Sequence, residues 1–442
     1  MIYADKNLNT PLTHSRQIKI IFNHKQSAFP QGTAFYFTSM KKVIIFIAAI
    51  IVNLQAQTQI AEGMWRGVLK LDAKKQIDLP FIFNVFYADG QPTFTIFNAE
   101  ETIVIDEIVQ KGDSLFFEMP VFDSEFRLQL FPGMMQGNWI NHARKDKNII
   151  PFEATYGKSQ RWPVASLIRS NFDGKWEATF SPGTPDSSKA IGLFKGNKQI
   201  ITGTFLTETG DYRYLDGVVD GKNFMMSCFD GSHAFLFTGT MDENGCINGM
   251  FYSGAHFQEK WIGKRNPKFE LRDPYSITKS VKKEPLEFSY TNAEGKKVSL
   301  SDPKFKDKVI IVQIMGSWCP NCMDETAYLS QLYNTYEKKG VEIIALAYEK
   351  TENMEKATKN VMRLKTKFGA QYEFLITGLT GRENAQKSLP WLSSVSAFPT
   401  TLYLNKKHEI VKIYTGYNGP ATGTAYLKMK ESIESLLNEL IK

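Results

Sequence analysis

A continuous apolar run that ends in a tryptophan and a pair of cysteines sets the strongest constraint on the fold of this chain. The run is "DKVIIVQIM" at residues 307–315. It shows no regular polar alternation, which is typical of a strand buried on both faces of a sheet. Helical periodicity follows directly, over about residues 320–338. A doubly buried strand that leads into a helix predicts an α/β sheet with helices packed on it.

The chain from about residue 285 continues this alternation of strands and helices. The remaining predicted elements are a buried strand at 341–348, a helix at 353–368, a strand at 372–377, a hairpin of 400–405 with 409–415, and an amphipathic helix at 425–441. On that last helix, the side predicted to be buried carries Leu427, Ile433, Leu436, Leu437, Leu440 and Ile441. We therefore predict an α/β domain with a mixed central sheet over 285–442, joined by a polar linker at 266–284.

Residues 57–265 show a different pattern, in which short apolar runs alternate with turn signals such as "ADGQP" and "ENG". This predicts an all-β antiparallel domain. The region also resembles itself at an offset of about 110 residues: "GMWRGVLKL" at 63–71 is similar to "GKWEATF" at 174–180. We expect an internal duplication, folded either as one closed barrel or as two packed sheets.

The length and net charge of the chain limit the number of domains and the kinds of partner to expect. With 442 residues the chain is too long for one ordinary core, so two or three domains are expected. The net charge is +7, but residues 1–56 hold six basic residues and one acid, which leaves 7 − 5 = +2 for the rest. Such a balance gives no basic footprint for nucleic acid, which we exclude as a partner.

A targeting segment is predicted near the start. "MKKVIIFIAAIIVNLQA" at 40–56 has a basic beginning, a short apolar stretch and "LQA" at 54–56 before a cleavage point after Ala56. We expect a secretory signal, a true start at Met40 and an extended reading frame upstream. The alternative is an uncleaved anchor, in which case the chain would meet a membrane. Both alternatives place the remainder outside the cytoplasm, in the periplasm or otherwise exported.

The cysteine pair allows three interpretations: a redox centre, a metal clip or a structural staple. A zinc clip needs two more ligands, whereas Cys228 and Cys246 belong to the β region and the nearest following histidine is His408. A disulfide closing so short a loop adds little stability. Redox chemistry is therefore expected at Cys319 and Cys322, with no metal and no cofactor. Cys228 and Cys246 are either paired with each other or two separate thiols.

The position of the pair assigns each thiol a role. Cys319 is expected at the strand-to-helix junction, where free backbone N–H groups and the helix dipole favour a thiolate. Cys322 lies one turn further and faces the same way. We expect Cys319 to be the low-pKa nucleophile and Cys322 the resolving thiol.

These residues resemble the thioredoxin superfamily, and within it the exported TlpA/ResA-like thiol–disulfide oxidoreductases. The resemblance covers about 285–442 and is carried by "KDKVIIVQIMGSWCPNCMDE", by "FPTT" at 398–401 and by Gly416. It implies a thioredoxin-like fold and thiol–disulfide exchange. The chain departs from the subgroup at Ala327, where a proline is common, and in the length of the insert at 349–398.

Site residues follow from the resemblance. Pro399 matches the cis-proline that faces the cysteine pair and, with Phe398, holds the partner's extended chain; the alternative is an ordinary turn proline. Trp318 is expected to shield the pair and to offer an apolar contact, a role compatible with plain packing. Glu325 matches an acid that raises a thiol pKa and passes protons. Its alternative is a solvated first-turn acid, and Gln313 stands where ordinary thioredoxin has its buried acid.

The predicted function is reduction of disulfides in exported partner proteins by the Cys-Pro-Asn-Cys pair, with electrons from a membrane thiol donor. A second hypothesis makes the β domain a module that captures a ligand or partner, with the redox domain accessory to it. Aromatic residues that would line its pocket, or else fill its core, are Trp65, Phe116, Trp139, Trp176 and Phe251. A peroxide-reducing enzyme of the same superfamily is a third hypothesis, disfavoured by the W-C-x-x-C arrangement.

Overall fold

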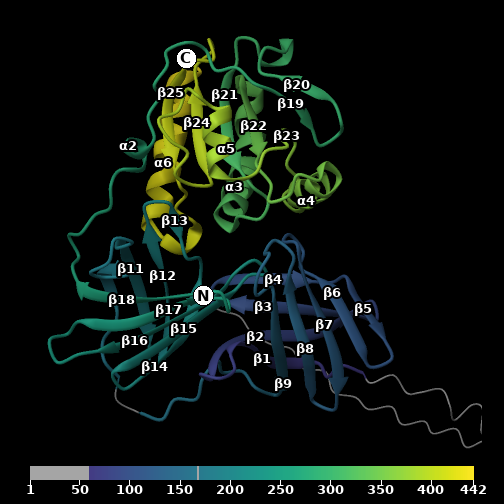
Figure 1. Ribbon diagram of the computed structural model, residues 1–442, viewed down its shortest axis with the longest axis vertical. Coiled ribbons are helices and arrows are strands. Elements are labelled where there is room, and N and C mark those ends of the chain that lie inside the picture. The colour runs from purple at the N-terminus through teal and green to yellow at the C-terminus, as the bar shows by residue number, and fades with distance from the viewer. Residues whose placement is uncertain (1–58, 167–168) are drawn as a thin grey trace, which may run out of the picture. The chain divides into compact units, whose positions relative to one another are not determined.

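The computed structural model describes residues 59–166 and 169–442, and Figure 1 shows their helices and strands. The expected signal segment at 40–56 and the residues before it lie outside the described residues. Three sheets make up the described chain, two antiparallel and one mixed. No helix in the described ranges is long and apolar enough to cross a lipid bilayer.

The first sheet is an antiparallel meander of nine strands. Its strands are β1 (Gly63–Asp72), β2 (Ile77–Ala88), β3 (Gln91–Asn98), β4 (Glu101–Ile105), β5 (Ile108–Lys111), β6 (Ser114–Glu118), β7 (Ser124–Phe131), β8 (Met134–Asn141) and β9 (Ile149–Tyr156). The order is β4-β3-β2-β1-β9-β8-β7-β6-β5, because β1 pairs with β9. This pairing brings the two ends of the meander together in the middle of the sheet.

The second sheet is also an antiparallel meander in which the first strand pairs with the last, and most of its strands form a closed ring. Its strands are β10 (Gly174–Phe180), β11 (Ser188–Asn197), β12 (Ile200–Thr207), β13 (Gly210–Asp211), β14 (Leu215–Asp220), β15 (Asn223–Phe229), β16 (Ala234–Met241), β17 (Ile247–Ser253) and β18 (Phe257–Arg265). Its first strand, β10, pairs with the last, β18, and β11 also pairs with β12. The ring β10-β11-β12-β14-β15-β16-β17-β18 is therefore continuous, which leaves only the short β13 outside it.

Both sheets surround filled aromatic cores. The predicted aromatic residues Trp65, Trp139, Trp176 and Phe251 are all buried there. The prediction for Phe116 is wrong: strand alternation turns it outward, half-buried, and its neighbour Phe117 fills the inner position. The cavity within the first core is only about 10 Å³, roughly the space of one water. Trp65, Trp139, Trp176 and Phe251 therefore act as core residues.

The first strand of each β sheet, β1 and β10, carries a tryptophan whose indole makes a similar hydrogen bond. The indole N–H of Trp65 donates to the Ala61 carbonyl at 2.9 Å, and that of Trp176 donates to the Phe172 carbonyl at 2.7 Å. The donor and acceptor are four residues apart in both cases. Common descent of the two halves stays a prediction.

The third sheet has seven strands in the order β20-β19-β23-β22-β21-β24-β25. Its strands are β19 (Ser289–Asn292), β20 (Lys297–Ser299), β21 (Val309–Met315), β22 (Val341–Ala347), β23 (Glu373–Ile376), β24 (Thr400–Leu404) and β25 (Ile410–Thr415). Strands β21, β22 and β23 are parallel to one another, and the other pairings are antiparallel. This is the mixed sheet predicted from the sequence. The β19–β20 hairpin was not predicted.

Helices complete this part of the chain. They are α2 (Pro274–Ile277), α3 (Pro320–Tyr336), α4 (Met354–Lys367), α5 (Gly381–Ser388) and α6 (Thr424–Leu440), with the 3-10 turns η1 (Pro303–Phe305), η2 (Glu337–Lys339) and η3 (Pro420–Thr422). The prediction for Leu427 is wrong, since 56% of it is exposed. The buried stripe of α6 runs through Met429, Ile433 and Leu437, four residues apart, and Leu427 lies outside it.

The segment that joins the β region to the third sheet lies against β25. The ring of Tyr275 on α2 packs edge-on against Tyr414, with 4.9 Å between the ring centroids. The Thr415 hydroxyl donates to the Thr278 hydroxyl at 2.8 Å. These contacts tie residues 274–278 to the C-terminal sheet.

Candidate redox site

The cysteine pair lies where β21 gives way to α3. Cys319 is the N-cap residue of α3, and its sulfur accepts the backbone N–H of Cys322 at 3.4 Å. Pro320 follows at the first helical position, where the missing N–H costs nothing. The structure thus places both sulfurs on the first turn of the helix, as the spacing predicts. An N-cap acceptor favours the anionic form of the group that caps the helix.

The two thiols are almost enclosed. Cys319 is 7% exposed and Cys322 is fully buried. The Cys319 thiol donates to the Phe398 carbonyl at 3.3 Å. Phe398 is followed by Pro399 through a cis peptide bond, as the resemblance implies. The fold therefore brings Cys319, Cys322, Phe398 and Pro399 together from two separate parts of the chain.

Trp318 covers one side of this group. Its indole N–H donates to the Tyr348 carbonyl at 3.0 Å, and its ring meets that of Phe398 edge-on at 5.5 Å between centroids. The side chain is half-buried, so one part of the indole remains open to solvent. This is compatible with both the shielding and the packing roles expected from the sequence.

Burial makes the Cys322 thiol harder to ionise than an exposed thiol. Its enclosed position raises the pKa of the Cys322 thiol well above the usual value, and the neighbouring Cys319 raises it further. All four cysteines are unbonded in the structure, including Cys228 and Cys246. Cys228 lies in the core of the second sheet, where burial also raises its thiol pKa.

Glu325 lies in the core behind the cysteines. Only 2% of it is exposed, so the solvated alternative does not describe it. Its carboxylate accepts hydrogen bonds from the Gln313 amide at 2.8 Å and from the Thr401 hydroxyl at 2.6 Å. Burial raises the pKa of Glu325 to about 7, against the lowering effect of these two donors. A carboxyl with this pKa can gain or lose a proton near neutral pH.

Gln313 connects this carboxylate to the pair. Its side-chain amide also donates to the Cys322 carbonyl at 3.3 Å, and it accepts from the Thr326 hydroxyl at 3.2 Å. The residue is fully buried on β21. Gln313 thus fixes the orientation of Glu325 relative to the helix turn that holds Cys322.

The sequence analysis missed a buried ion cluster beside the pair. Arg213, from the turn between β13 and β14, donates to Asp324 at 2.6 Å and to the Pro320 carbonyl at 3.3 Å. It also pairs with Glu101 and, at 3.4 Å, with Asp230. Burial raises the pKa of Asp324 to about 7, and the charge of Arg213 opposes that rise. No local pattern links Arg213 to α3, because 111 residues separate it from Asp324.

A second missed residue holds the loop before the tryptophan. Glu349, at the end of β22, accepts the backbone N–H of Ser317 at 2.8 Å and the Ser317 hydroxyl at 2.7 Å. Burial raises the pKa of Glu349, partly offset by these two bonds. The only sequence signal was its place directly after a buried strand, on the edge where β21 delivers the cysteines.

Among the residues that the structure describes, no group of three or more histidine, cysteine or acidic side chains could hold a metal ion. The site is instead a pair of close thiols at a helix start, backed by a carboxyl with a pKa near neutrality. This chemistry, on a mixed sheet with a cis-proline opposite, defines a thioredoxin-like protein of thiol–disulfide exchange.

Comparisons with known proteins agree with this class. The Redoxin family model matches residues 263–428. "Thiol-disulfide oxidoreductase ResA" of Bacillus thuringiensis (strain Al Hakam) is 31% identical over 148 residues, covering 34% of this chain and 77% of the relative. ResA of Bacillus cereus (strain ATCC 10987 / NRS 248) is 43% identical over 72 residues, covering 16% of this chain and 40% of the relative. The chain belongs to the TlpA/ResA-like thiol–disulfide oxidoreductases of the thioredoxin superfamily.

Solved structures give matches of lower similarity. A thiol-disulfide oxidoreductase from Bacteroides fragilis NCTC 9343 is 19% identical, with a TM-score of 0.26, and the match covers 34% of this chain and 99% of that one. A thiol:disulfide interchange protein of the thioredoxin family from Chlorobium tepidum TLS is 20% identical, with a TM-score of 0.26, covering 34% and 97%.

Proposed function

We propose that this enzyme is exported and reduces disulfides of partner proteins through Cys319 and Cys322. The observation that carries the proposal is the Cys319 sulfur at the N-cap of α3, where it accepts the Cys322 N–H at 3.4 Å. Cys319 is also the less buried of the two thiols, so it is the one that a partner's disulfide can reach.

The reaction proceeds in two exchanges. The Cys319 thiolate attacks one sulfur of the partner's disulfide; the S–S bond breaks, a mixed disulfide forms and the other partner sulfur leaves as a thiolate. Cys322 then loses its proton and attacks Cys319, which releases the second partner sulfur. Two electrons pass to the partner, and the enzyme ends with a Cys319–Cys322 disulfide. No cofactor enters either step.

Glu325 supports the second exchange. Cys322 must give up a proton although burial holds its pKa high. Glu325 lies within electrostatic reach of Cys322, and Gln313 joins the two residues by hydrogen bonds to the Cys322 carbonyl and to the carboxylate. A carboxylate with a pKa of about 7 can accept the proton at neutral pH. Glu325 therefore acts as the base for the resolving thiol.

Trp318, Phe398 and Pro399 form the surface for the partner chain. The Phe398 carbonyl lies 3.3 Å from the Cys319 sulfur, and the Trp318 ring borders Phe398. An extended segment carrying the partner's cystine binds along Phe398 and Pro399, with the open part of Trp318 as its apolar contact. Both contacts lie beside the attacking sulfur, where they align it with the disulfide.

The direction of electron flow depends on the potential of the pair. We propose a reductant that is restored by a membrane thiol donor, which matches an exported location. The test is equilibration of the Cys319/Cys322 couple with glutathione buffers. A potential near −270 mV, as in thioredoxin, supports the proposal, whereas one near −120 mV makes the enzyme an oxidant.

Export rests on the segment at 40–56. The expected mature chain starts at Gln57, and the measurement is the N-terminal sequence of protein purified from the extracytoplasmic fraction. Protein found only in the cytoplasm with its apolar segment intact would contradict export. Protein that stays in the membrane fraction with residues 40–56 retained would support the anchored alternative.

A trapping experiment tests the exchange itself. The variant Cys322→Ala should hold partner proteins in mixed disulfides on Cys319, visible as bands that disappear on reduction. The matched control is Cys319→Ala, which should trap nothing because Cys322 is enclosed. Proper folding of both variants is checked by circular dichroism. If folded Cys322→Ala captures neither protein nor a model disulfide, the proposed mechanism fails.

A further inference from the structure

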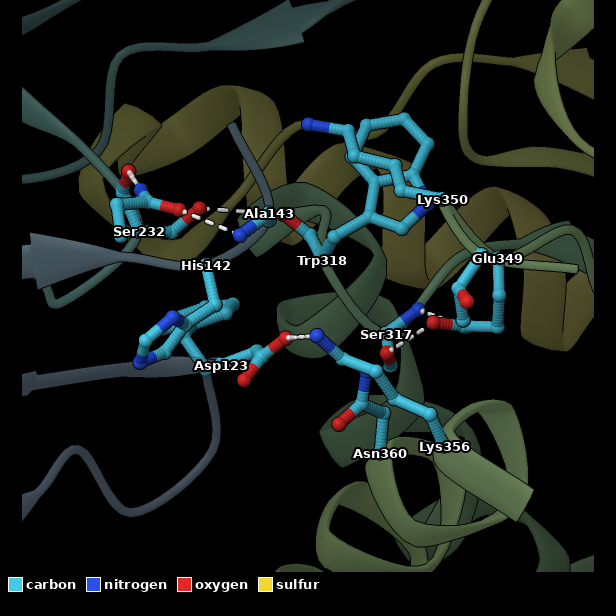
Figure 2. A pocket seen from close by; sticks show the side chains of 13 residues that line it. Asp123, His142, Ala143, Ser232, Ser317, Trp318, Glu349, Lys350, Lys356 and Asn360 are labelled. Atoms are coloured by element: carbon cyan, nitrogen blue, oxygen red, sulfur yellow. Dashed lines mark hydrogen bonds and ion pairs between the residues drawn. The ribbon is translucent and has the colours of Figure 1, made fainter. Parts of the chain in front are cut away.

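A loop of the first sheet is anchored next to the redox tryptophan. The loop runs over residues 142–148, between β8 and β9. The backbone N–H of Ala143 donates to the Asn141 side chain at 3.0 Å, and the Asn141 amide donates to the Ser232 carbonyl at 3.0 Å. The Ser232 hydroxyl in turn donates to the Trp318 carbonyl at 3.2 Å (Figure 2). This chain of bonds fixes the loop beside the residue that precedes Cys319.

Loop and redox site share the walls of one small pocket. Its cavity volume is about 30 Å³, and its lining includes His142 and Ala143 of the loop with Trp318 and Lys350 of the redox domain. Figure 2 shows the Lys350 side chain beside the Trp318 ring, and its ammonium lies 4.4 Å from the ring centroid. Lys350 therefore stands at the rim of the open part of Trp318.

Positive charge gathers at this rim. Residues 142–147, "HARKDK", carry three basic side chains and one acid, so the loop contributes +2. Arg144 is half-buried, and this burial lowers the pKa of its guanidinium. Within the described ranges, neither Arg144 nor Lys350 takes part in an ion pair. Arg144 and Lys350 lie close enough to interact electrostatically, and Lys350 also interacts with Cys319 and with Glu349.

The pKa of a neighbouring histidine reflects the same accumulation of positive charge. Partial burial, followed by the charges of Arg144, His233, Lys147 and Lys350, lowers the pKa of His256 to about 4. Several of the nearby carboxylates already have partners: Asp123 pairs with Lys356 at 2.8 Å, and Glu349 is bound to Ser317. Glu349 nevertheless acts on Lys350 electrostatically, and the exposed acids Asp146 and Glu352 lie near the two cations in the sequence.

We propose that Arg144 and Lys350 form a docking surface for an acidic segment that flanks the cystine of the partner protein. The inference rests on the proposed function, because it concerns the substrate of the same cysteine pair. A partner whose cystine lies against Cys319 extends past Trp318, and its neighbouring residues then meet this basic rim. Asp or Glu there would supply direct ion-pair partners for Arg144 and Lys350. The β region thereby takes part in choosing the substrate.

The basic side chains at the rim should act mainly on the rate at which the substrate associates with the enzyme. Exposed cations beside a reactive group raise the local concentration of an oppositely charged partner and speed its association, and salt weakens this effect. The expected signature is therefore a higher kcat/KM for acidic substrates at low ionic strength, with kcat little changed.

The test uses two model substrates, each a peptide with one disulfide, flanked either by four Glu or by four Ser residues. In 20 mM salt, the double variant Arg144→Glu/Lys350→Glu should lower kcat/KM for the Glu peptide about tenfold and leave the Ser peptide within about twofold. Added salt should shrink the difference in the unchanged enzyme. The control is Lys407→Glu, an exposed lysine in the β24–β25 turn, at the other end of β24 from Pro399.

The outcomes separate this inference from the proposed function. Equal rates for the two peptides in the unchanged enzyme, or an equal loss for both peptides in the double variant, would overturn the docking surface while exchange itself stands. If the unchanged enzyme reduces neither peptide, the proposed function fails and the docking surface fails with it. Melting temperatures of the variants show whether a loss of rate comes from unfolding.

Discussion

Arg213, in the turn between β13 and β14, donates a hydrogen bond of 2.6 Å to Asp324 on α3, two residues after Cys322. Both side chains are largely removed from water, with 2% and 15% of their surfaces exposed. The same guanidinium reaches the Pro320 carbonyl between the two cysteines. A single cation of the β region is therefore attached to the helix turn that carries Cys319 and Cys322.

Replacing Arg213 with Met should destabilise the protein by about 3–5 kcal/mol. The change removes the partner of Asp324, Glu101 and Asp230 and leaves buried carboxylates uncompensated. The measurement is the free energy of unfolding from urea titrations at pH 7. A matched control is Arg272→Met, whose solvent-exposed pair with Glu208 should contribute little to stability. Similar small losses in both variants would show that the buried cluster does not hold these parts together.

Glu325 should make the stability of the enzyme fall as the pH rises from about 5 to 7. The folded protein keeps this carboxyl protonated up to about pH 7, whereas the unfolded chain ionises it near its ordinary pKa of 4.5. The folded state then binds one more proton than the unfolded state, so stability decreases by roughly 1.4 kcal/mol per pH unit in that window. Asp324, also raised to about 7, adds a contribution of the same sign.

The variant Glu325→Gln should remove the contribution of this carboxyl and make the dependence less steep, while Asp324 and Glu349, whose pKa values burial also raises, keep theirs. Urea titrations at pH 5, 6, 7 and 8 measure the slope. Glu383→Gln is the control, because Glu383 is exposed on α5 and pairs with Lys387. An unchanged slope in Glu325→Gln would mean that the carboxyl is ionised throughout this range and cannot act as the proposed base near neutrality.

The C-terminal fold could be predicted because its signals are local. Continuous apolar runs mark β21 and β22, and these strands are buried along almost their whole length. The placement of Cys319 and Glu325 followed from helical spacing, which puts residues three apart on one face. Burial of Glu325 was not certain from spacing alone, since the same position suits a solvated acid. The donors that hold it, Gln313 and Thr401, lie 12 and 76 residues away.

Other features depend on contacts that no local pattern encodes. Phe116 and Phe117 are adjacent and equally apolar, so only the observed register decides which one faces the core. Leu427 is apolar but is not three or four residues from Met429, Ile433 or Leu437, so it lies off the buried stripe of α6. Closure of the second sheet depends on pairing of β11 with β12 and of β10 with β18, the latter between strands at opposite ends of the meander.

Phe229 should stabilise the first sheet although it belongs to the second. It ends β15, and its ring stacks on Phe81 at 4.7 Å and meets Trp139 edge-on at 5.2 Å between centroids. Phe229→Ala should cost about 3–5 kcal/mol, and hydrogen exchange should increase in strands of both sheets. The control Phe257→Ala removes a ring that is 46% exposed and should cost far less. Faster exchange confined to the second sheet would show that the first core does not depend on this ring.

Gly416 should tolerate no side chain, because a loop of the second sheet lies against it. Its φ is +80°, and a Cβ would lie 2.7 Å from the backbone carbonyl carbon of Thr209. Gly295 gives a matched control, since its φ is +81° and a Cβ there would meet nothing within 4 Å. Both changes to Ala carry the left-handed backbone cost of about 1–2 kcal/mol. Gly416→Ala should cost about 1–3 kcal/mol more, because the added methyl overpacks a fixed backbone contact.

The comparison of the two glycine variants isolates the contact with Thr209 from the cost of backbone conformation. Unfolding free energies measured in urea give the difference directly. The amide N–H of Gly416 donates to the Pro399 carbonyl at 2.9 Å, so a shift of residue 416 also moves the proline that faces Cys319. Gly416→Ala should therefore slow disulfide exchange as well, whereas Gly295→Ala should leave the rate unchanged. Equal losses of stability with equal rates would show that the loop at Thr209 yields freely and that the β region does not restrain the redox site there.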